Sequence, residues 1–323
     1  MISLSHGHGC FNRLRRNFAS SLGVPRMTRV RARETAYPAV WKFFGSICAA
    51  MQSLSDCAIG VVGFGLAMLS SFAHCRRVFG TGLGFVAVGV GGVFVFPLLN
   101  VFIRRREARA AMSRDVIGFA FRCIVRSMRA LGVFLYEVKG LEKLDRRGLL
   151  ILANHPTLID IIFLMGLVKR ADCIVKSALW LNPFTHCTVR AAAFVRNDDD
   201  GTCVVEDCVA AVRRGSNLII FPEGTRTPSD GAIRLKRGAA NIAVRAMRNV
   251  TPVLIRCTPT MLGKGSPWWR LPAQPSFFQI EVKDDIDIRP FVYDAVSEGI
   301  AARRLTEYLQ AYFSGECSRY AAS

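Results

Sequence analysis

The sequence predicts an α/β fold in which helices flank a central mixed sheet, preceded by N-terminal transmembrane or amphipathic helices. Two observations predict it. After Gly132, short β-like segments alternate with helical segments. Before Gly132, a long uncharged apolar stretch runs directly into a group of arginines. The length of 323 residues accommodates one large α/β domain together with such an N-terminal part.

Charge and hydropathy together favour a lipid surface as a partner. The chain carries a net charge of +19 and a positive mean hydropathy of +0.28. Residues 1–150 contain 22 Lys or Arg against 7 Asp or Glu, so the basic excess lies in that half. Basic chains bind nucleic acid or anionic lipid. Because long uncharged stretches are unusual in nucleic-acid-binding domains, we expect membrane lipid and no nucleic acid.

The cysteines predict neither a disulfide framework nor a metal site. There are 11 of them, scattered without a CxxC pair. Cys203 and Cys208 have no second pair and no nearby histidine to complete a zinc site. We therefore expect reduced thiols that face a cytosolic compartment, and no metal.

The N-terminal part divides into a tail and a membrane anchor. Residues 1–42 are rich in Arg, Ser and Gly, which predicts a disordered basic tail; a mitochondrial-type presequence has the same composition. Residues 43–103 predict a membrane-anchoring segment whose best span, 78–103, holds no charged residue. The shorter stretch Cys57–Cys75 is either a second span or an interfacial helix. Two buried helices of a soluble core are the remaining alternative.

Residues 104–132 predict a basic amphipathic helix. The arginines that directly follow the span mark its cytoplasmic side, so we expect the rest of the chain to be cytoplasmic. Arg122, Arg126 and Arg129 recur at helical spacing beside apolar residues, which suits a helix lying on anionic lipid. An ordinary surface helix that packs on the domain fits the same pattern.

Residues 133–315 predict the main domain. Its expected strands are Phe134–Lys139, Leu149–Ala153, Cys173–Lys176, Ala192–Arg196, Leu218–Phe221, Val253–Cys257 and Phe278–Val282. Its expected helices are 157–169, 202–214, 233–248 and 296–313.

A histidine follows the second of these strands. The segment Leu150–Asp160 runs from strand to turn to helix, so His155 lies at the carboxyl edge of the sheet, where sites of α/β proteins usually lie. Asp160 follows five residues later, and the first helical turn can bring its carboxylate beside the imidazole. This arrangement suits a general base. A capping box formed by Thr157 and Asp160 would explain the aspartate structurally instead.

A second strand end carries another polar cluster. Leu218-Ile-Ile-Phe-Pro-Glu-Gly-Thr-Arg226 places a carboxylate, a glycine and an arginine in one turn. A purely structural role rarely requires all of these residues at the end of one strand, so the two motifs together indicate a catalytic site.

The two motifs resemble those of the glycerophospholipid acyltransferases related to bacterial 1-acylglycerol-3-phosphate acyltransferase (PlsC-type enzymes). The resemblance rests on Asn154-His155-Pro156 through Asp160 and on Phe221 through Arg226, in this order. It extends from about Val138 to Pro290 and includes the lysine-bearing segment at Lys176. It implies that 133–315 is an acyltransferase catalytic domain with the glycerolipid acyltransferase fold.

The resemblance also implies a mechanism. His155, oriented by Asp160, would take the proton from a lipid hydroxyl that attacks the thioester of acyl-CoA or acyl carrier protein. Glu223, Gly224, Thr225 and Arg226 would bind the acceptor, with Arg226 suited to a phosphate. The oxyanion donors stay open between the 154–157 turn and the Gly224 turn. The default acceptor is 1-acylglycerol-3-phosphate, which gives phosphatidate, and no metal or redox cofactor is implied.

Two positions depart from the family pattern. Arg196 falls one position early for the arginine of the second motif, and it binds phosphate or caps a strand. Arg256 stands where the family commonly has an apolar residue or proline, which favours a different, specialised lipid acceptor. Lys176 contacts phosphate or the acyl donor, or ends a strand. A hydrolase that releases the acyl group to water and a non-enzymatic lipid-binding protein are the rivals from other classes; no G-x-S-x-G elbow is present.

Overall fold

The computed structural model describes residues 72, 74–84, 86–87, 89–183, 185–197, 201–228, 231–267 and 269–321. The expected basic tail 1–42 lies outside the described residues, as does nearly all of the earlier apolar stretch Cys57–Cys75. The fold and the candidate site are built from the described residues alone.

A seven-stranded mixed sheet forms the centre of the domain, in the order β1-β7-β6-β2-β5-β3-β4. All neighbouring strands are parallel except β6 and β7, which are antiparallel. The expected mixed sheet is therefore confirmed, and a strand is found at every expected position. The strands are β1 (Phe134–Lys139), β2 (Leu150–Ala153), β3 (Ala171–Lys176), β4 (Val195–Asn197), β5 (Asn217–Ile220), β6 (Val250–Thr258) and β7 (Ser276–Val282).

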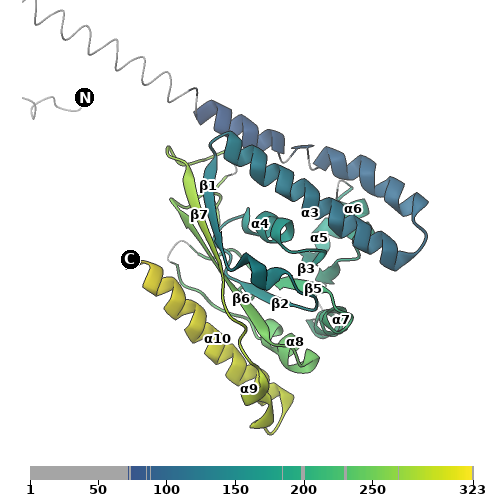
Figure 1. The fold of residues 1–323 in the computed structure, drawn as a ribbon, viewed down its shortest axis with the longest axis vertical. Coiled ribbons are helices and arrows are strands. Elements are labelled where there is room, and N and C mark those ends of the chain that lie inside the picture. The colour runs from purple at the N-terminus through teal and green to yellow at the C-terminus, as the bar shows by residue number, and fades with distance from the viewer. Residues whose placement is uncertain are drawn as a thin grey trace, which may run out of the picture. The chain divides into compact units, whose positions relative to one another are not determined.

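Helices cover both faces of the sheet (Figure 1). The helices are α3 (Arg106–Ala130), η1 (Leu141–Leu144), α4 (Asp160–Leu167), α5 (Ser177–Leu181), α6 (His186–Ala191), α7 (Gly201–Arg213), α8 (Gly238–Ala246), α9 (Arg289–Tyr293) and α10 (Glu298–Ala321). One apolar core lies between the sheet and α3 and α4, and a second lies under α7, α8 and α10. The short helices α5, α6 and α9 were not expected from the sequence.

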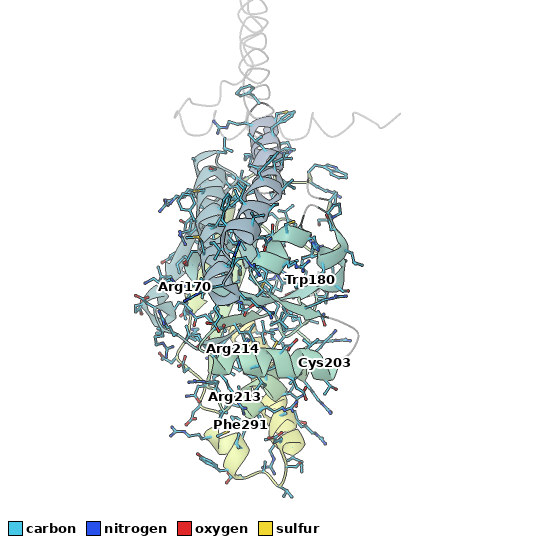
Figure 2. The ribbon with its side chains drawn as sticks, turned by 90° about the vertical axis from the view of Figure 1, so that its right-hand side faces the viewer. Arg170, Trp180, Cys203, Arg213, Arg214 and Phe291 are labelled. Atoms are coloured by element: carbon cyan, nitrogen blue, oxygen red, sulfur yellow. The ribbon has the colours of Figure 1, made fainter. Side chains whose placement is uncertain are left out.

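A helix of 29 residues, His74–Phe102, precedes α3 and is the one described helix that is long and apolar enough to cross a membrane. It lies alongside α3, as the side view shows (Figure 2). A Cβ on Gly80 would collide with the Leu131 side chain, so the glycine allows close packing at the end of α3. Because only 12% of its most apolar window is buried, the helix keeps a broad exposed apolar surface.

The helix α3 packs on the domain through Ile117, Ile124 and Met128, which are buried. Of its arginines, Arg122 donates to the Gly166 carbonyl at 3.1 Å and Arg114 forms a buried ion pair with Asp172 at 2.7 Å. The expectation of an ordinary packing helix therefore holds for this face of α3.

Candidate active site

The order of the strands brings the two motifs together. Because β2 lies between β5 and β6, the segments that follow β2 and β5 leave the sheet side by side. Leu152 pairs with Ile220, so His155 and Phe221 follow the sheet at nearly the same level. This is the carboxyl edge of parallel strands, where α/β folds usually hold their ligands.

His155 and Asp160 form a hydrogen-bonded pair at this edge. His155 Nδ1 lies 2.9 Å from Asp160 Oδ2. The Asp160 side chain is fully buried, whereas the His155 side chain keeps 16% of its exposure. Because Nδ1 faces the carboxylate, proton exchange with a substrate falls to Nε2. The expected geometry of a base and its orienting carboxylate is therefore present.

The same carboxylate also caps the turn before α4. Asp160 Oδ2 accepts a hydrogen bond from Thr157 N at 2.7 Å, and Oδ1 accepts one from Thr157 Oγ1 at 2.5 Å. The capping interpretation and the catalytic interpretation are thus compatible, since one carboxylate serves both contacts. Burial raises the pKa of Asp160, and the hydrogen bonds from His155 and Thr157 oppose that rise.

An aromatic ring holds the other side of the imidazole. The rings of His155 and Phe221 are stacked, with centroids 4.0 Å apart and planes at 19°. Phe221 follows β5, so the second motif packs against the imidazole of the first. The stacked ring and the carboxylate together fix the orientation of His155.

Glu223 holds the backbone of the histidine turn. Its Oε1 accepts hydrogen bonds from His155 N and Thr227 Oγ1, both at 2.9 Å. Thr227 N donates in turn to the His155 carbonyl at 2.7 Å. Burial raises the pKa of Glu223. The structure therefore gives Glu223 a positioning contact, and its expected role in acceptor binding stays a prediction.

The rest of the second motif forms the exposed rim of the site. Gly224 has a φ of +69°, the left-handed region that favours glycine, and Gly224 and Thr225 are exposed. A Cβ on Gly224 would lie 3.0 Å from Lys236 Nζ, so this lysine crosses the turn. Arg226 Nη1 donates to the carbonyls of Leu262 and Gly263 at 2.9 and 2.8 Å, which anchors it to the loop after β6.

Asn154 locks the histidine turn to the neighbouring strand. Its Nδ2 donates to the Ile255 carbonyl at 2.8 Å, and its Oδ1 accepts from Ile255 N at 2.7 Å. The side-chain amide thereby continues the backbone pairing of β2 and β6 beyond the end of β2. The sequence marked Asn154 only through the family motif, and its partner on β6 could not be read from it.

Lys176 and Arg196 lie at the same edge but farther along the sheet. Lys176 ends β3 and Arg196 lies on β4, and both are exposed. Since β5 separates β3 from β2, Lys176 is roughly 10 Å from the histidine strand at the usual strand spacing. Arg196 lies one strand farther away, on β4, and the expected contact of both residues with substrate stays a prediction.

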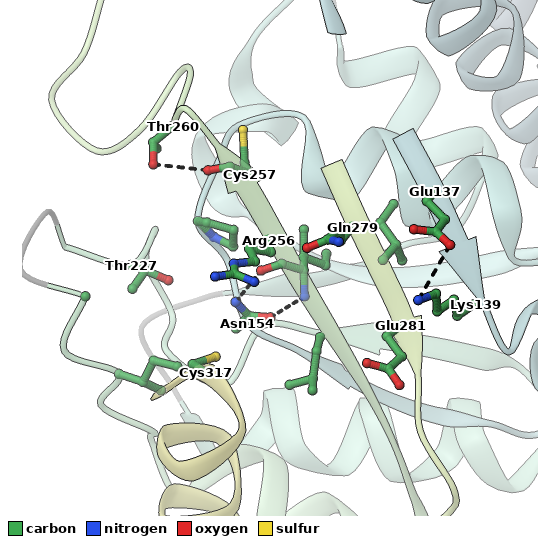
Figure 3. A pocket seen from close by; sticks show the side chains of 16 residues that line it. Glu137, Lys139, Asn154, Thr227, Arg256, Cys257, Thr260, Gln279, Glu281 and Cys317 are labelled. Atoms are coloured by element: carbon green, nitrogen blue, oxygen red, sulfur yellow. Dashed lines mark hydrogen bonds and ion pairs between the residues drawn. The ribbon is translucent and has the colours of Figure 1, made fainter. Parts of the chain in front are cut away.

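A pocket of about 430 Å³ adjoins the histidine turn (Figure 3). Asn154 and Pro156, the neighbours of His155, line one end of it together with Thr227. From there it follows the outer face of β6, β7 and β1 past Arg256 and Gln279, with Cys317 of α10 on the opposite side. Among the described residues, no group of His, Cys, Asp or Glu is placed to hold a metal ion.

A family model described as acyltransferase matches residues 136–256, which include both motifs. The chain is 27% identical over 165 residues to 1-acyl-sn-glycerol-3-phosphate acyltransferase from Pseudomonas aeruginosa, covering 50% of this chain and 64% of that relative. It is 27% identical over 161 residues to the human beta enzyme of the same name, covering 48% and 56%. The chain thus spans less than two thirds of the length of these curated relatives.

A solved structure shares the fold. The crystal structure of the 1-acyl-sn-glycerophosphate (LPA) acyltransferase, PlsC, from Thermotoga maritima superposes with a TM-score of 0.57. The match covers 78% of this chain and 98% of that chain, at 24% sequence identity. This likeness concerns the fold.

Proposed function

Because the chain belongs to the glycerophospholipid acyltransferase family, we propose that it transfers a fatty acyl group from a thioester to a lipid hydroxyl. The default acceptor is 1-acylglycerol-3-phosphate, the substrate that the names of the relatives indicate, and the product is phosphatidate. The observation that carries the proposal is the contact between His155 Nδ1 and the buried carboxylate of Asp160, 2.9 Å apart, at the carboxyl edge of the sheet.

In the proposed reaction, His155 acts through Nε2. It takes the proton of the acceptor hydroxyl while that oxygen attacks the thioester carbonyl, which forms the new C–O bond. The tetrahedral intermediate then expels the thiolate as the C–S bond breaks, and the imidazolium returns its proton to the sulfur. Asp160 keeps the proton of neutral His155 on Nδ1 and stabilises the imidazolium between the two steps.

The rim of the site is the proposed place for the acceptor phosphate. Arg226 and Lys236 bring two cations to the turn that contains the exposed Gly224 and Thr225. A cationic rim suits a phosphate monoester. Lys176 and Arg196 extend positive charge along the same edge, and Glu223 acts by holding the His155 backbone. The reaction as proposed requires neither a metal nor a redox cofactor.

Membrane association follows from the lipid substrate and the apolar helix. The helix His74–Phe102 exposes Phe79, Phe94 and Phe102, with between 68% and 78% of each side chain accessible. We infer that it lies in a membrane and that the catalytic domain is on the cytoplasmic side, because arginines follow the apolar stretch at once. A lipid acceptor would then reach the site without leaving the bilayer.

One observation favours a second candidate acceptor. Arg256 is half-buried in the pocket beside the histidine turn, at a position where the family commonly has an apolar residue or proline. A specialised lipid acceptor with a larger polar group is therefore the alternative within the same reaction class.

The test measures thiol release from acyl-CoA and from acyl carrier protein by membranes that contain the protein. Each donor is supplied with and without 1-acylglycerol-3-phosphate, and the lipid product is identified by mass spectrometry. We expect release that requires the acceptor and yields phosphatidate. Release without any acceptor would indicate a hydrolase instead, and release only with another lysolipid in a panel would support the specialised acceptor.

A further inference from the structure

The pocket beside the histidine turn has an assignable ligand. Its long wall is formed by β6, β7 and β1 (Figure 3). The turn that contains Asn154 and Pro156 borders it. A ligand that fills it therefore reaches the turn that contains His155. From Cys257 to Leu254 the wall follows β6 for roughly 10 Å, at about 3.3 Å per residue.

Two cross-strand rows of side chains form this wall. The register places Arg256, Gln279 and Glu137 in the first row, across β6, β7 and β1. Two residues earlier along β6, it places Leu254, Glu281 and Lys139 in the second row. Side chains two apart on a strand share a face, so both rows point into the pocket.

The charges of this wall balance. Two cations, Arg256 and Lys139, stand with two anions, Glu137 and Glu281. Lys139 Nζ lies 3.6 Å from Glu137, and Glu281 lies 2.9 Å from Lys283 Nζ. In a chain of net charge +19, a neutral wall contrasts with the cationic rim at Gly224. It suits a neutral ligand with hydrogen-bonding groups better than a phosphate dianion.

The end of the pocket near the histidine turn is polar but not ionic. Thr227, Thr260 and Asn154 supply hydroxyl and amide groups there, beside the thiols of Cys257 and Cys317. Burial raises the pKa of Cys257 to about 12 and that of Cys317 to about 11. Both thiols therefore stay protonated at neutral pH and are poor nucleophiles toward a thioester held beside them.

We propose that this pocket holds the pantetheine arm of the acyl donor and delivers its thioester to the turn at His155. The inference rests on the proposed acyl transfer. A pantetheine arm is a narrow, uncharged chain with two amides and a hydroxyl, so it matches a neutral wall lined by Gln279, Asn154 and threonines. Coenzyme A and acyl carrier protein share this arm, and the pocket serves either donor.

The variant Gln279→Phe tests the assignment, because Gln279 lies at the centre of the first row and is only half-buried. We expect KM for acyl-CoA, acyl-pantetheine and acyl carrier protein to rise about tenfold or more, with KM for the lipid acceptor unchanged. A short donor without the arm, the acyl thioester of ethanethiol, has neither amide nor hydroxyl and should be used equally by the variant and the wild type. Val296→Phe adds bulk at a side chain that is 95% exposed, between α9 and α10 and outside the pocket, and is the control.

Three results would overturn the assignment: an unchanged KM for all donors, a raised KM for the lipid acceptor instead, or an equal loss with the short donor. An effect on acyl carrier protein alone would also contradict it, since that result places a protein contact and not the arm at Gln279.

A binding measurement separates failure of this inference from failure of the proposed reaction. Desulfo-coenzyme A, which has no thiol, should protect the wild type against thermal unfolding by raising its Tm, and should protect Gln279→Phe much less at the same concentration. Protection without acyl transfer would sink the proposed reaction while keeping the pocket assignment. Acyl transfer without protection, and without a donor effect in Gln279→Phe, would sink the pocket assignment alone.

Discussion

At the residue scale, Glu223 illustrates how a motif residue can act through another. Its carboxylate oxygen Oε1 accepts hydrogen bonds from His155 N and from Thr227 Oγ1, so it fixes the turn that contains His155. These contacts require an acceptor oxygen and not a negative charge. The positioning role of Glu223 therefore depends on its shape and its acceptor oxygen, and not on its charge.

We predict that Glu223→Gln folds and transfers acyl groups within a few-fold of the wild type, whereas Glu223→Ala loses about 1–3 kcal/mol of stability and most activity. Since burial raises the folded-state pKa of Glu223 above its unfolded value, its stabilising contribution falls as pH rises through the folded pKa. Glu223→Gln should thus gain stability relative to wild type with rising pH. Denaturant unfolding measures the stability of both variants, and initial rates measure their acyl transfer. If Glu223→Gln is as inactive as Glu223→Ala, the negative charge of Glu223 is required, which would indicate a role in substrate binding.

Asp160 shows the opposite case, in which the charge is needed. Both oxygens accept hydrogen bonds from Thr157, and Oδ2 also faces His155 Nδ1. In Asp160→Asn, an NH₂ group replaces one carboxylate oxygen and must face one of these donors, so the hydrogen bond at that position is lost. We expect the transfer rate to fall about 10²-fold or more, in the range typical of lost general-base assistance. A full rate in a folded Asp160→Asn variant would leave the carboxylate only its capping role.

At the scale of elements, α3 is joined to the sheet by a buried ion pair. Arg114 Nη2 lies 2.7 Å from Asp172 of β3, and Arg114 Nε donates to the Ala192 carbonyl at 2.9 Å. Burial raises the pKa of Asp172 to about 6, and the Arg114 guanidinium opposes that rise. Arg114 therefore helps to hold α3 on the domain.

We predict that Arg114→Met costs about 3–5 kcal/mol at neutral pH, because it leaves a buried carboxylate without its partner. The folded pKa of Asp172 lies above its unfolded value of 3.8, so the stability it contributes is full below that value and is lost as pH rises through about 6. Without Arg114 the folded pKa rises further, and the penalty should be larger at pH 8 than at pH 5. Denaturant unfolding at both pH values measures this.

The exposed i,i+4 pair Arg303–Glu307 on α10 provides the control for that prediction. Arg303→Met should change stability by less than about 1 kcal/mol at either pH. A similar cost for the two variants, or a cost of Arg114→Met that does not depend on pH, would contradict the assignment of a buried pair.

The elements also show which parts of the fold were predictable from the sequence. Strands such as β1 and β6 were predicted because alternating or continuous apolar residues report burial directly. Strand β4 begins later than expected, at Val195, because Ala192 caps α6 and Ala193 turns with a φ of +50°. The helices α5 and α6 are too short, at 5 and 6 residues, to produce a helical period.

At the scale of the whole molecule, the site combines local signals with contacts that no local pattern contains. The spacing of His155 and Asp160 predicted their pairing because five residues span one turn into a helix. Lys236 and Thr227 escaped prediction, because their roles depend on Gly224 and on the His155 carbonyl, which only the folded chain brings near. The partner of Asn154 lies 101 residues away on β6, a separation that sequence spacing does not encode.

Two surfaces of different charge adjoin the turn that contains His155. A cationic rim with Arg226 and Lys236 lies on one side, and a charge-balanced pocket adjoins the other flank at Asn154 and Pro156. The proposed transfer requires that an anionic acceptor and a long neutral donor arm are held at the same time. We propose the rim as the place of the acceptor and the pocket as the place of the donor arm.

The central claim is that His155 is the base that activates the acceptor hydroxyl. The most direct measurement compares acceptor-dependent thiol release by wild type, His155→Ala and His186→Ala, the last being a half-buried histidine on α6 outside the two motifs. The account predicts that His155→Ala loses about 10²–10⁴-fold in rate while remaining folded, and that His186→Ala keeps nearly full activity. Acceptor-dependent release by His155→Ala at the wild-type rate would contradict it.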